Sequence, residues 1–149
     1  MSGPVASAKH KILKPVSECF DAVINKDKIT KFFVSTASAD MTEGAVLVWS
    51  WAEFNASGNV TIGKIEPNKS ITFNWLGGGF QTTVVITFEE SINGQATLVK
   101  AEETGFPLTI EGANAACGQT GGWMHFILSM KAYLEHGINL REGGVWTLN

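Results

Sequence analysis

The sequence predicts an α+β domain in which a curved, six-stranded antiparallel sheet wraps around a long C-terminal helix. Between residues 46 and 103, apolar residues alternate with polar ones, and turn signals recur about every ten residues. Between residues 123 and 134, apolar residues recur at helical spacing instead. The 149 residues are the usual size of one domain, so the apolar face of the sheet and the apolar stripe of the helix must be buried against each other.

The residues before this sheet predict one short strand and two short helices. His10–Leu13 alternates weakly and reads as the first strand, which Pro15 ends. Ser17 is a suitable N-cap for a helix over residues 17–24, and Asp27 for a second helix. Their apolar residues are Cys19, Phe20, Val23 and Ile24 in the first helix, and Ile29, Phe32 and Phe33 in the second.

Five further strands follow in the middle of the chain. They are predicted over Val46–Ala52, Asn59–Glu66, Ser70–Leu76, Thr82–Glu90 and Ala96–Glu103. The connecting segments are short and rich in Gly, Asn or Pro, with Asn93-Gly94 as the clearest turn signal. Such connections favour antiparallel hairpins between neighbouring strands.

The long C-terminal helix is predicted from one apolar stripe. The stripe consists of Trp123, Phe126, Ile127, Met130, Tyr133 and Leu134. Gly137 is a natural residue to end the helix. Three glycines at 118, 121 and 122 each weaken a helix by about 1 kcal/mol relative to Ala, so we expect the helix to begin between Ala113 and Thr120. We interpret Gly121 and Gly122 as allowing close approach of the helix to the sheet.

The composition excludes several classes of protein. The net charge is −3 and Arg141 is the single arginine, which argues against a nucleic-acid partner. No apolar run approaches the roughly 18 residues of a membrane span, and no apolar signal segment begins the chain. Cys19 and Cys117 lack metal-ligand spacing and read as buried thiols, with a disulfide as the alternative. We therefore expect a cytoplasmic protein without a metal or another cofactor.

The whole chain, residues 1–149, is treated as one domain with two short extensions. Residues 1–8 are small and polar and are expected to form a disordered lead-in. Residues 138–149 form a tail with an apolar Val145-Trp146 pair. The tail either folds back on the sheet, which we favour, or packs on a second subunit, so a monomer and a homodimer both stay open.

Three motifs in register resemble those of a known family. They are Pro15-Val-Ser-Glu-Cys-Phe20; Gly63-Lys-Ile-Glu-Pro67 followed by Ile71-Thr-Phe-Asn-Trp75; and Glu103-Thr-Gly-Phe106 followed by Gly122-Trp123 and a helix ending at Gly137. In this order they resemble the SRPBCC or START-like superfamily, and more narrowly the homologues of the activator of the heat-shock-protein-90 ATPase. The sequence departs from the family pattern at Glu43-Gly44, at Phe32-Phe33, and at Glu103, where the family often has His. The resemblance implies a helix-grip fold that encloses an apolar pocket.

The aromatic residues suggest where such a pocket would lie. Five Trp and nine Phe are many for this length, and they fit either a plain core or a lined cavity between sheet and helix. Period two pairs Trp49 with Trp51 and Phe73 with Trp75, and we expect both pairs to face inward. An outward Trp49 and Trp51 would instead suggest a dimer surface. The predicted ligand-binding residues are Trp49, Trp51, Phe73, Trp75, Phe80, Glu103, Phe106, Trp123, Ile127 and Met130.

Glu103 is the one residue with a candidate chemical role. Alternation places it on the same inner face as Val99 and Ala101. It is either a buried carboxylate satisfied by a hydroxyl, indole or backbone N–H, or a group that orients a ligand or acts as general acid and base. His10, His125 and His136 show no metal-ligand spacing and read as surface residues.

Three functions follow, in order of preference. The first is binding of a small hydrophobic or amphipathic molecule in the cavity. The second, implied by the resemblance, is a co-chaperone-like module that contacts a chaperone protein and stimulates its ATPase. The third, implied by related helix-grip domains, is a cyclase or dehydratase that uses Glu103, although an enzyme is the less favoured interpretation.

Overall fold

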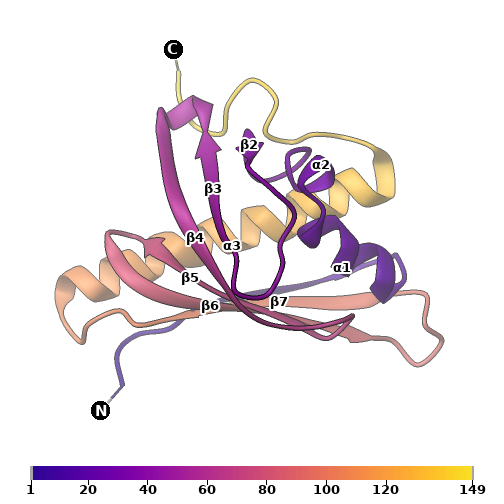
Figure 1. The fold of residues 1–149 in the computed structure, drawn as a ribbon, viewed down its shortest axis with the longest axis horizontal. Helices are drawn as coiled ribbons and strands as arrows, with labels where there is room; N and C mark the ends of the chain where they lie inside the picture. The colour runs from indigo at the N-terminus through magenta and orange to yellow at the C-terminus, as the bar shows by residue number, and fades with distance from the viewer. Residues whose placement is uncertain (1, 149) are drawn as a thin grey trace.

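The computed structural model describes residues 2–148 of the chain. In this range, seven strands form one antiparallel sheet in the order β1-β7-β6-β5-β4-β3-β2. The long helix α3 (Ile110–His136) crosses one face of the curved sheet (Figure 1). The predicted α+β helix-grip class is confirmed, with one strand more than the six expected.

The strands match the predicted ones with shifts at their ends. They are β1 (Ala6–Ile12), β2 (Thr36–Ala37), β3 (Val46–Trp51), β4 (Ala56–Glu66), β5 (Ser70–Gly77), β6 (Phe80–Glu90) and β7 (Thr97–Thr104). The unexpected strand β2 has two residues, too few for any periodicity, and pairs with Ser50 and Trp49.

β1 begins at Ala6, inside the segment 1–8 that was expected to be disordered. Ala6 pairs with Glu103 and Ala8 with Ala101, and both alanines are buried. Residues 6–8 are ordered because they pair with β7, which is far away in the sequence, and their local sequence does not indicate this pairing. Met1 lies outside the described residues.

Besides α3, the described chain has three short helical segments: α1 (Val16–Ile24), α2 (Lys26–Ile29) and the 3-10 turn η1 (Ala52–Phe54). The predicted caps were wrong by two residues in each helix. Pro15 precedes α1, because its fixed φ of −60° already suits a helix start. Asn25 caps α2, and its side chain accepts a hydrogen bond from the Asp27 N–H at 2.9 Å.

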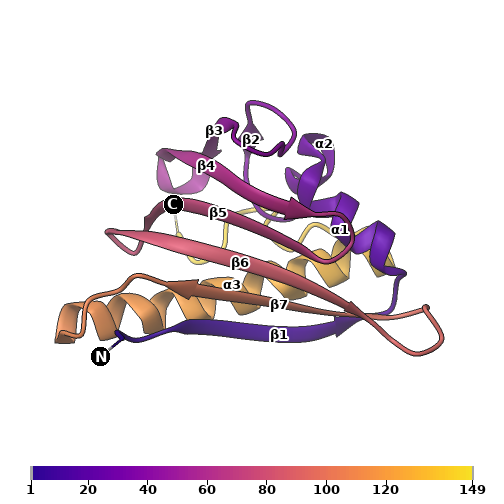
Figure 2. The same cartoon turned by 60° about the horizontal axis from the view of Figure 1, so that its bottom comes forward.

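The helix α3 begins earlier and ends where predicted. Thr109 is its N-cap and accepts a hydrogen bond from the Gly112 N–H at 3.0 Å. Gly137 ends it with a left-handed φ of 67°. The helix lies along β1 and β7, as Figure 2 shows, and this packing outweighs the poor helix propensity of its glycines.

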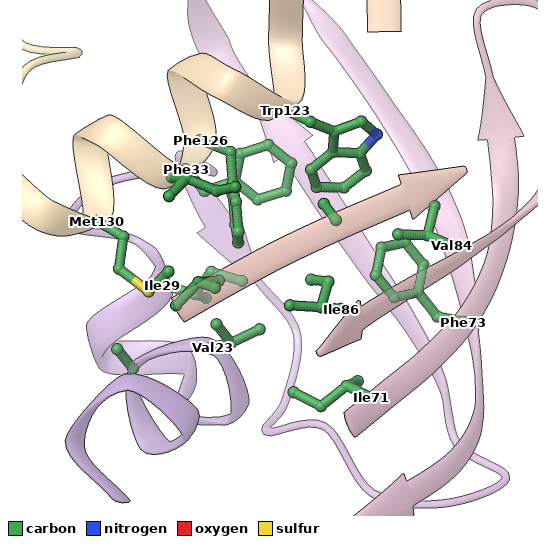
Figure 3. Packing of buried hydrophobic residues seen from close by; sticks show 14 of the residues in the cluster. Val23, Ile29, Phe33, Ile71, Phe73, Val84, Ile86, Trp123, Phe126 and Met130 are labelled. Atoms are coloured by element: carbon green, nitrogen blue, oxygen red, sulfur yellow. The ribbon is translucent and has the colours of Figure 1, made fainter. Parts of the chain in front are cut away.

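The main core lies between the inner face of the sheet and α3, toward the end occupied by α1 and α2. Figure 3 shows Trp123 and Met130 of α3 facing Phe73 and Ile86 of the sheet, with Ile29 closing one side. The pattern of burial in β3 confirms the predicted orientation, since Leu47 and Trp49 are buried while Val46 and Val48 are 61% and 45% exposed. Trp49 and Trp51 therefore point inward.

Candidate ligand-binding cavity

A cavity of about 730 Å³ lies beside the first half of α3. Its walls are the last residues of β3 and β5, the first residues of β4, the first half of α3, and the C-terminal tail. Its volume falls within the roughly 300–1,000 Å³ typical of small-molecule sites.

The helix wall of the cavity is made largely of glycine. Gly118, Gly121 and Gly122 all line it. A Cβ atom placed on any of the three would meet no atom of its surroundings within 4 Å. The expectation that Gly121 and Gly122 allow close helix–sheet packing was therefore wrong, because these residues face open space.

Aromatic rings from the sheet, from α3 and from the loop after α2 also line the cavity. The indole of Trp75 lies 5.9 Å from that of Trp51 and 5.6 Å from that of Trp123, measured between ring centroids. Phe33, from the loop after α2, lies 5.8 Å from Trp123 and also borders the cavity. These rings support one another at the distances that favour aromatic pairs.

Glu103, on β7, is fully buried directly behind this wall. Its Oε2 accepts hydrogen bonds from Trp75 Nε1 at 3.0 Å and from Thr82 Oγ1 at 2.6 Å. Its Oε1 accepts from Gln119 Nε2 at 2.9 Å and from Trp123 Nε1 at 2.7 Å. All four donors are neutral groups, so hydrogen bonds alone compensate the buried carboxylate.

This carboxylate joins the sheet to the helix at the cavity. Glu103 itself does not line the cavity, but its partners Trp75, Gln119 and Trp123 do. Gly77 leaves the space that the carboxylate occupies, since a Cβ at that position would lie 1.9 Å from Glu103 Oε2. The geometry thus favours the satisfied-carboxylate interpretation of Glu103, with indole and hydroxyl donors.

The C-terminal tail folds back over the end of β3, as favoured from the sequence. Arg141 Nη2 donates to Glu53 Oε1 at 2.5 Å, and Trp146 packs on Phe54 with ring centroids 5.1 Å apart. Arg141, Val145 and Trp146 line the cavity. The last residue, Asn149, lies outside the described part of the chain.

His125, on α3, lies beside Arg141 at the same end of the cavity. Its Nδ1 is 3.3 Å from Arg141 Nη1. Burial, and then the charge of Arg141, lower the pKa of His125. The imidazole is therefore neutral near pH 7, and Nδ1 accepts from the guanidinium because arginine can only donate.

The predicted site residues occupy three places. Trp51, Trp75 and Trp123 line the cavity. Trp49, Phe73, Phe106, Ile127 and Met130 lie in the packed core, and Phe80 packs against it with its ring centroid 6.4 Å from that of Phe106. Glu103 is buried behind the cavity wall. The glycine wall and the tail were not among the predicted site residues. Three glycines at i, i+3 and i+4 on one helix were a signal for the glycine wall.

Within residues 2–148, no three His, Cys, Asp or Glu side chains gather as a metal site. No helix in that range is long and apolar enough to cross a membrane.

Comparison with solved structures shows the same fold in several proteins. The protein SSP2350 from Staphylococcus saprophyticus is 30% identical, with a TM-score of 0.79 over 93% of this chain and 96% of that one. The Aha1 dimer from Colwellia psychrerythraea is 19% identical, with a TM-score of 0.74 over 90% and 98%.

A third similar structure is DynU16, a putative protein in the dynemicin biosynthetic locus. It is 24% identical, with a TM-score of 0.76. The match covers 89% of this chain but 48% of DynU16, so this chain spans about half the length of DynU16. A search of curated proteins gave no match. The family described as Activator of Hsp90 ATPase homolog 1-like protein matches residues 14–135. Since the match covers most of the chain and the resemblance seen in the motifs agrees with it, this protein belongs to that family.

Proposed function

We propose that this protein binds a small hydrophobic or amphipathic molecule in the cavity between the sheet, α3 and the tail. The observation that carries the proposal is the glycine wall. Each of Gly118, Gly121 and Gly122 costs the helix about 1 kcal/mol relative to Ala, and nothing in the surrounding structure requires the side chain to be missing. A ligand that occupies the space would explain why it is kept open.

The aromatic side chains around the cavity support the same function. Trp51, Trp75 and Trp123 are proposed as the main ligand contacts, because they present large apolar surfaces to the cavity. The hydrogen bonds from Trp75 and Trp123 to Glu103 hold two of these indoles in place before a ligand arrives. Such preorganisation reduces the entropic cost of binding.

The test is a panel of lipids and aromatic compounds, read by tryptophan fluorescence and native mass spectrometry. Gly121→Leu places a side chain in the cavity, with a Cβ that meets no protein atom within 4 Å, and we expect it to weaken binding at least about tenfold. Asn114→Leu adds the same side chain to an exposed position of α3 that does not line the cavity, and should leave binding unchanged. If no compound binds, or if Gly121→Leu binds as the wild type does, the proposal is wrong.

A co-chaperone role is the second candidate, and the description of the family favours it. It would require a compartment shared with a chaperone, and the free thiols of Cys19 and Cys117 fit the cytoplasm that we propose. An ATPase assay with a bacterial Hsp90 decides this point, since an unchanged hydrolysis rate at saturating protein excludes stimulation.

A cyclase or dehydratase activity receives less support. General acid–base catalysis needs a group within reach of the substrate, and Glu103 is fully buried and does not line the cavity. For any activity found, the variant Glu103→Gln should retain the reaction on every substrate that the folded variant still binds.

A further inference from the structure

We propose that the ligand of this cavity carries an acidic group, such as a carboxylate, and that Arg141 on the C-terminal tail binds it. The inference rests on the proposed function and specifies the chemical class of the ligand. In this proposal the tail takes part in recognition of the ligand as well as in lining the cavity.

In the described part of the chain, the lining of the cavity contains one formally charged side chain. Among the residues that line the cavity, Arg141 alone carries a formal charge, and it is the single arginine of the chain. Its side chain is only 15% exposed, so its charge acts in a poorly solvated environment. The rest of the lining is aromatic, aliphatic, glycine or neutral polar.

Arg141 is paired with Glu53, but neither Glu53 nor Glu103 lines the cavity, so Arg141 is the ionic group that the cavity presents to a ligand. Glu53 does not line the cavity, and its Oε1 takes one N–H of the guanidinium. Its Oε2 is buried without a hydrogen-bond partner among residues 2–148 and lies 3.7 Å from where a Cβ on Gly144 would be. Glu103 is engaged by its four donors behind the aromatic wall.

Hydrogen-bond donors are available where the acidic group would lie. The guanidinium contacts Glu53 through Nη2 and His125 through Nη1, and among residues 2–148 its other N–H groups have no hydrogen-bond partner. Since Nδ1 of neutral His125 accepts from Arg141, its Nε2 carries a proton and can donate as well. Arg141 and His125 thus place hydrogen-bond donors at one end of an aromatic cavity, which is complementary to a ligand with an apolar body and an anionic group. Arginine is suited to bind a carboxylate through two parallel hydrogen bonds.

A matched pair of probes tests the inference. Anthracene-2-carboxylate and anthracene-2-carboxamide share the same apolar body and differ in charge, and quenching of tryptophan fluorescence reports the binding of each. We expect the carboxylate to bind the wild type at least about tenfold more tightly than the amide. Arg141→Gln should remove that difference by weakening the carboxylate alone.

Glu53→Gln is the control for the ion pair between tail and sheet. It breaks the same ion pair as Arg141→Gln but keeps the cation, so the carboxylate should bind it at least as tightly as it binds the wild type. Equal affinity of the two probes for the wild type would overturn the inference and leave the proposed function standing. The same holds if Arg141→Gln weakens both probes equally, since the tail would then be only an apolar wall. Failure of both probes overturns the inference as well, and the proposed function fails only if the wider panel also shows no binding.

Discussion

Replacing Glu103 with Gln is expected to destabilise the fold even though the two side chains have nearly the same shape. Each carboxylate oxygen accepts from one indole, Oε2 from Trp75 and Oε1 from Trp123. The amide of Gln replaces one oxygen with an NH₂ group, which donates. An indole N–H can only donate, so one of the two loses its acceptor whichever way the amide is turned.

The size of the effect follows from that single lost acceptor. Leaving a buried donor unsatisfied costs about 1–3 kcal/mol. For a domain of this size that corresponds to a fall in Tm of roughly 2–12 °C. Glu103→Leu deprives both indoles of their acceptor, and we expect a loss of about 2–6 kcal/mol, a large part of the roughly 5–15 kcal/mol that stabilises a typical domain.

Urea unfolding followed by far-UV circular dichroism measures these losses, provided that the m-value stays unchanged. Glu102→Gln is the matched control, because Glu102 is the neighbouring residue on the other face of β7, with a half-exposed side chain 3.3 Å from Lys100 Nζ. Its free energy of unfolding should change by less than about 0.5 kcal/mol. If Glu103→Gln unfolds at the same urea concentration as Glu102→Gln, the four hydrogen bonds to Glu103 do not stabilise the fold.

Three further predictions concern other positions. Gly77→Ala should destabilise the protein by about 1–3 kcal/mol or more, because the new Cβ would overlap the buried carboxylate of Glu103. Gly58→Ala is the control and should be tolerated, because its Cβ would meet no atom within 4 Å. The urea midpoints of the two variants test this difference. The pKa of His125 is lowered in the folded state, so the unfolded chain takes up the proton first, and the free energy of unfolding should fall as the pH drops through 6.5. The loss between pH 8 and pH 5, measured by urea unfolding, should be smaller in His125→Gln than in the wild type. An equal loss in both proteins would refute the lowered pKa. Burial raises the pKa of the Cys19 thiol while Cys117 is exposed, so a thiol reagent should modify one cysteine in the native protein and the second only in urea.

Much of the fold was predictable because its signals are local. Period-two alternation in β3 to β7 and the helical stripe headed by Trp123 each lie within one segment, and Gly137 ends α3 by its own backbone preference. The same alternation correctly placed Trp49 and Glu103 on the inner face. The elements that were missed depend on distant partners: β2 pairs with the end of β3, and β1 starts early because β7 is beside it.

The composition of the candidate site was decided by tertiary structure. Glu103 meets its donors 16 to 28 residues away in the sequence, and Arg141 meets Glu53 across 88 residues. No local pattern specifies which distant side chains converge, because that depends on the register and curvature of the sheet. By itself the sequence determined which residues face inward, since the direction of a side chain follows from local backbone geometry. The sequence does not determine whether the glycines of α3 face a neighbouring strand or an open cavity. That depends on the distances between the sheet, the helix and the tail, which only the folded structure decides.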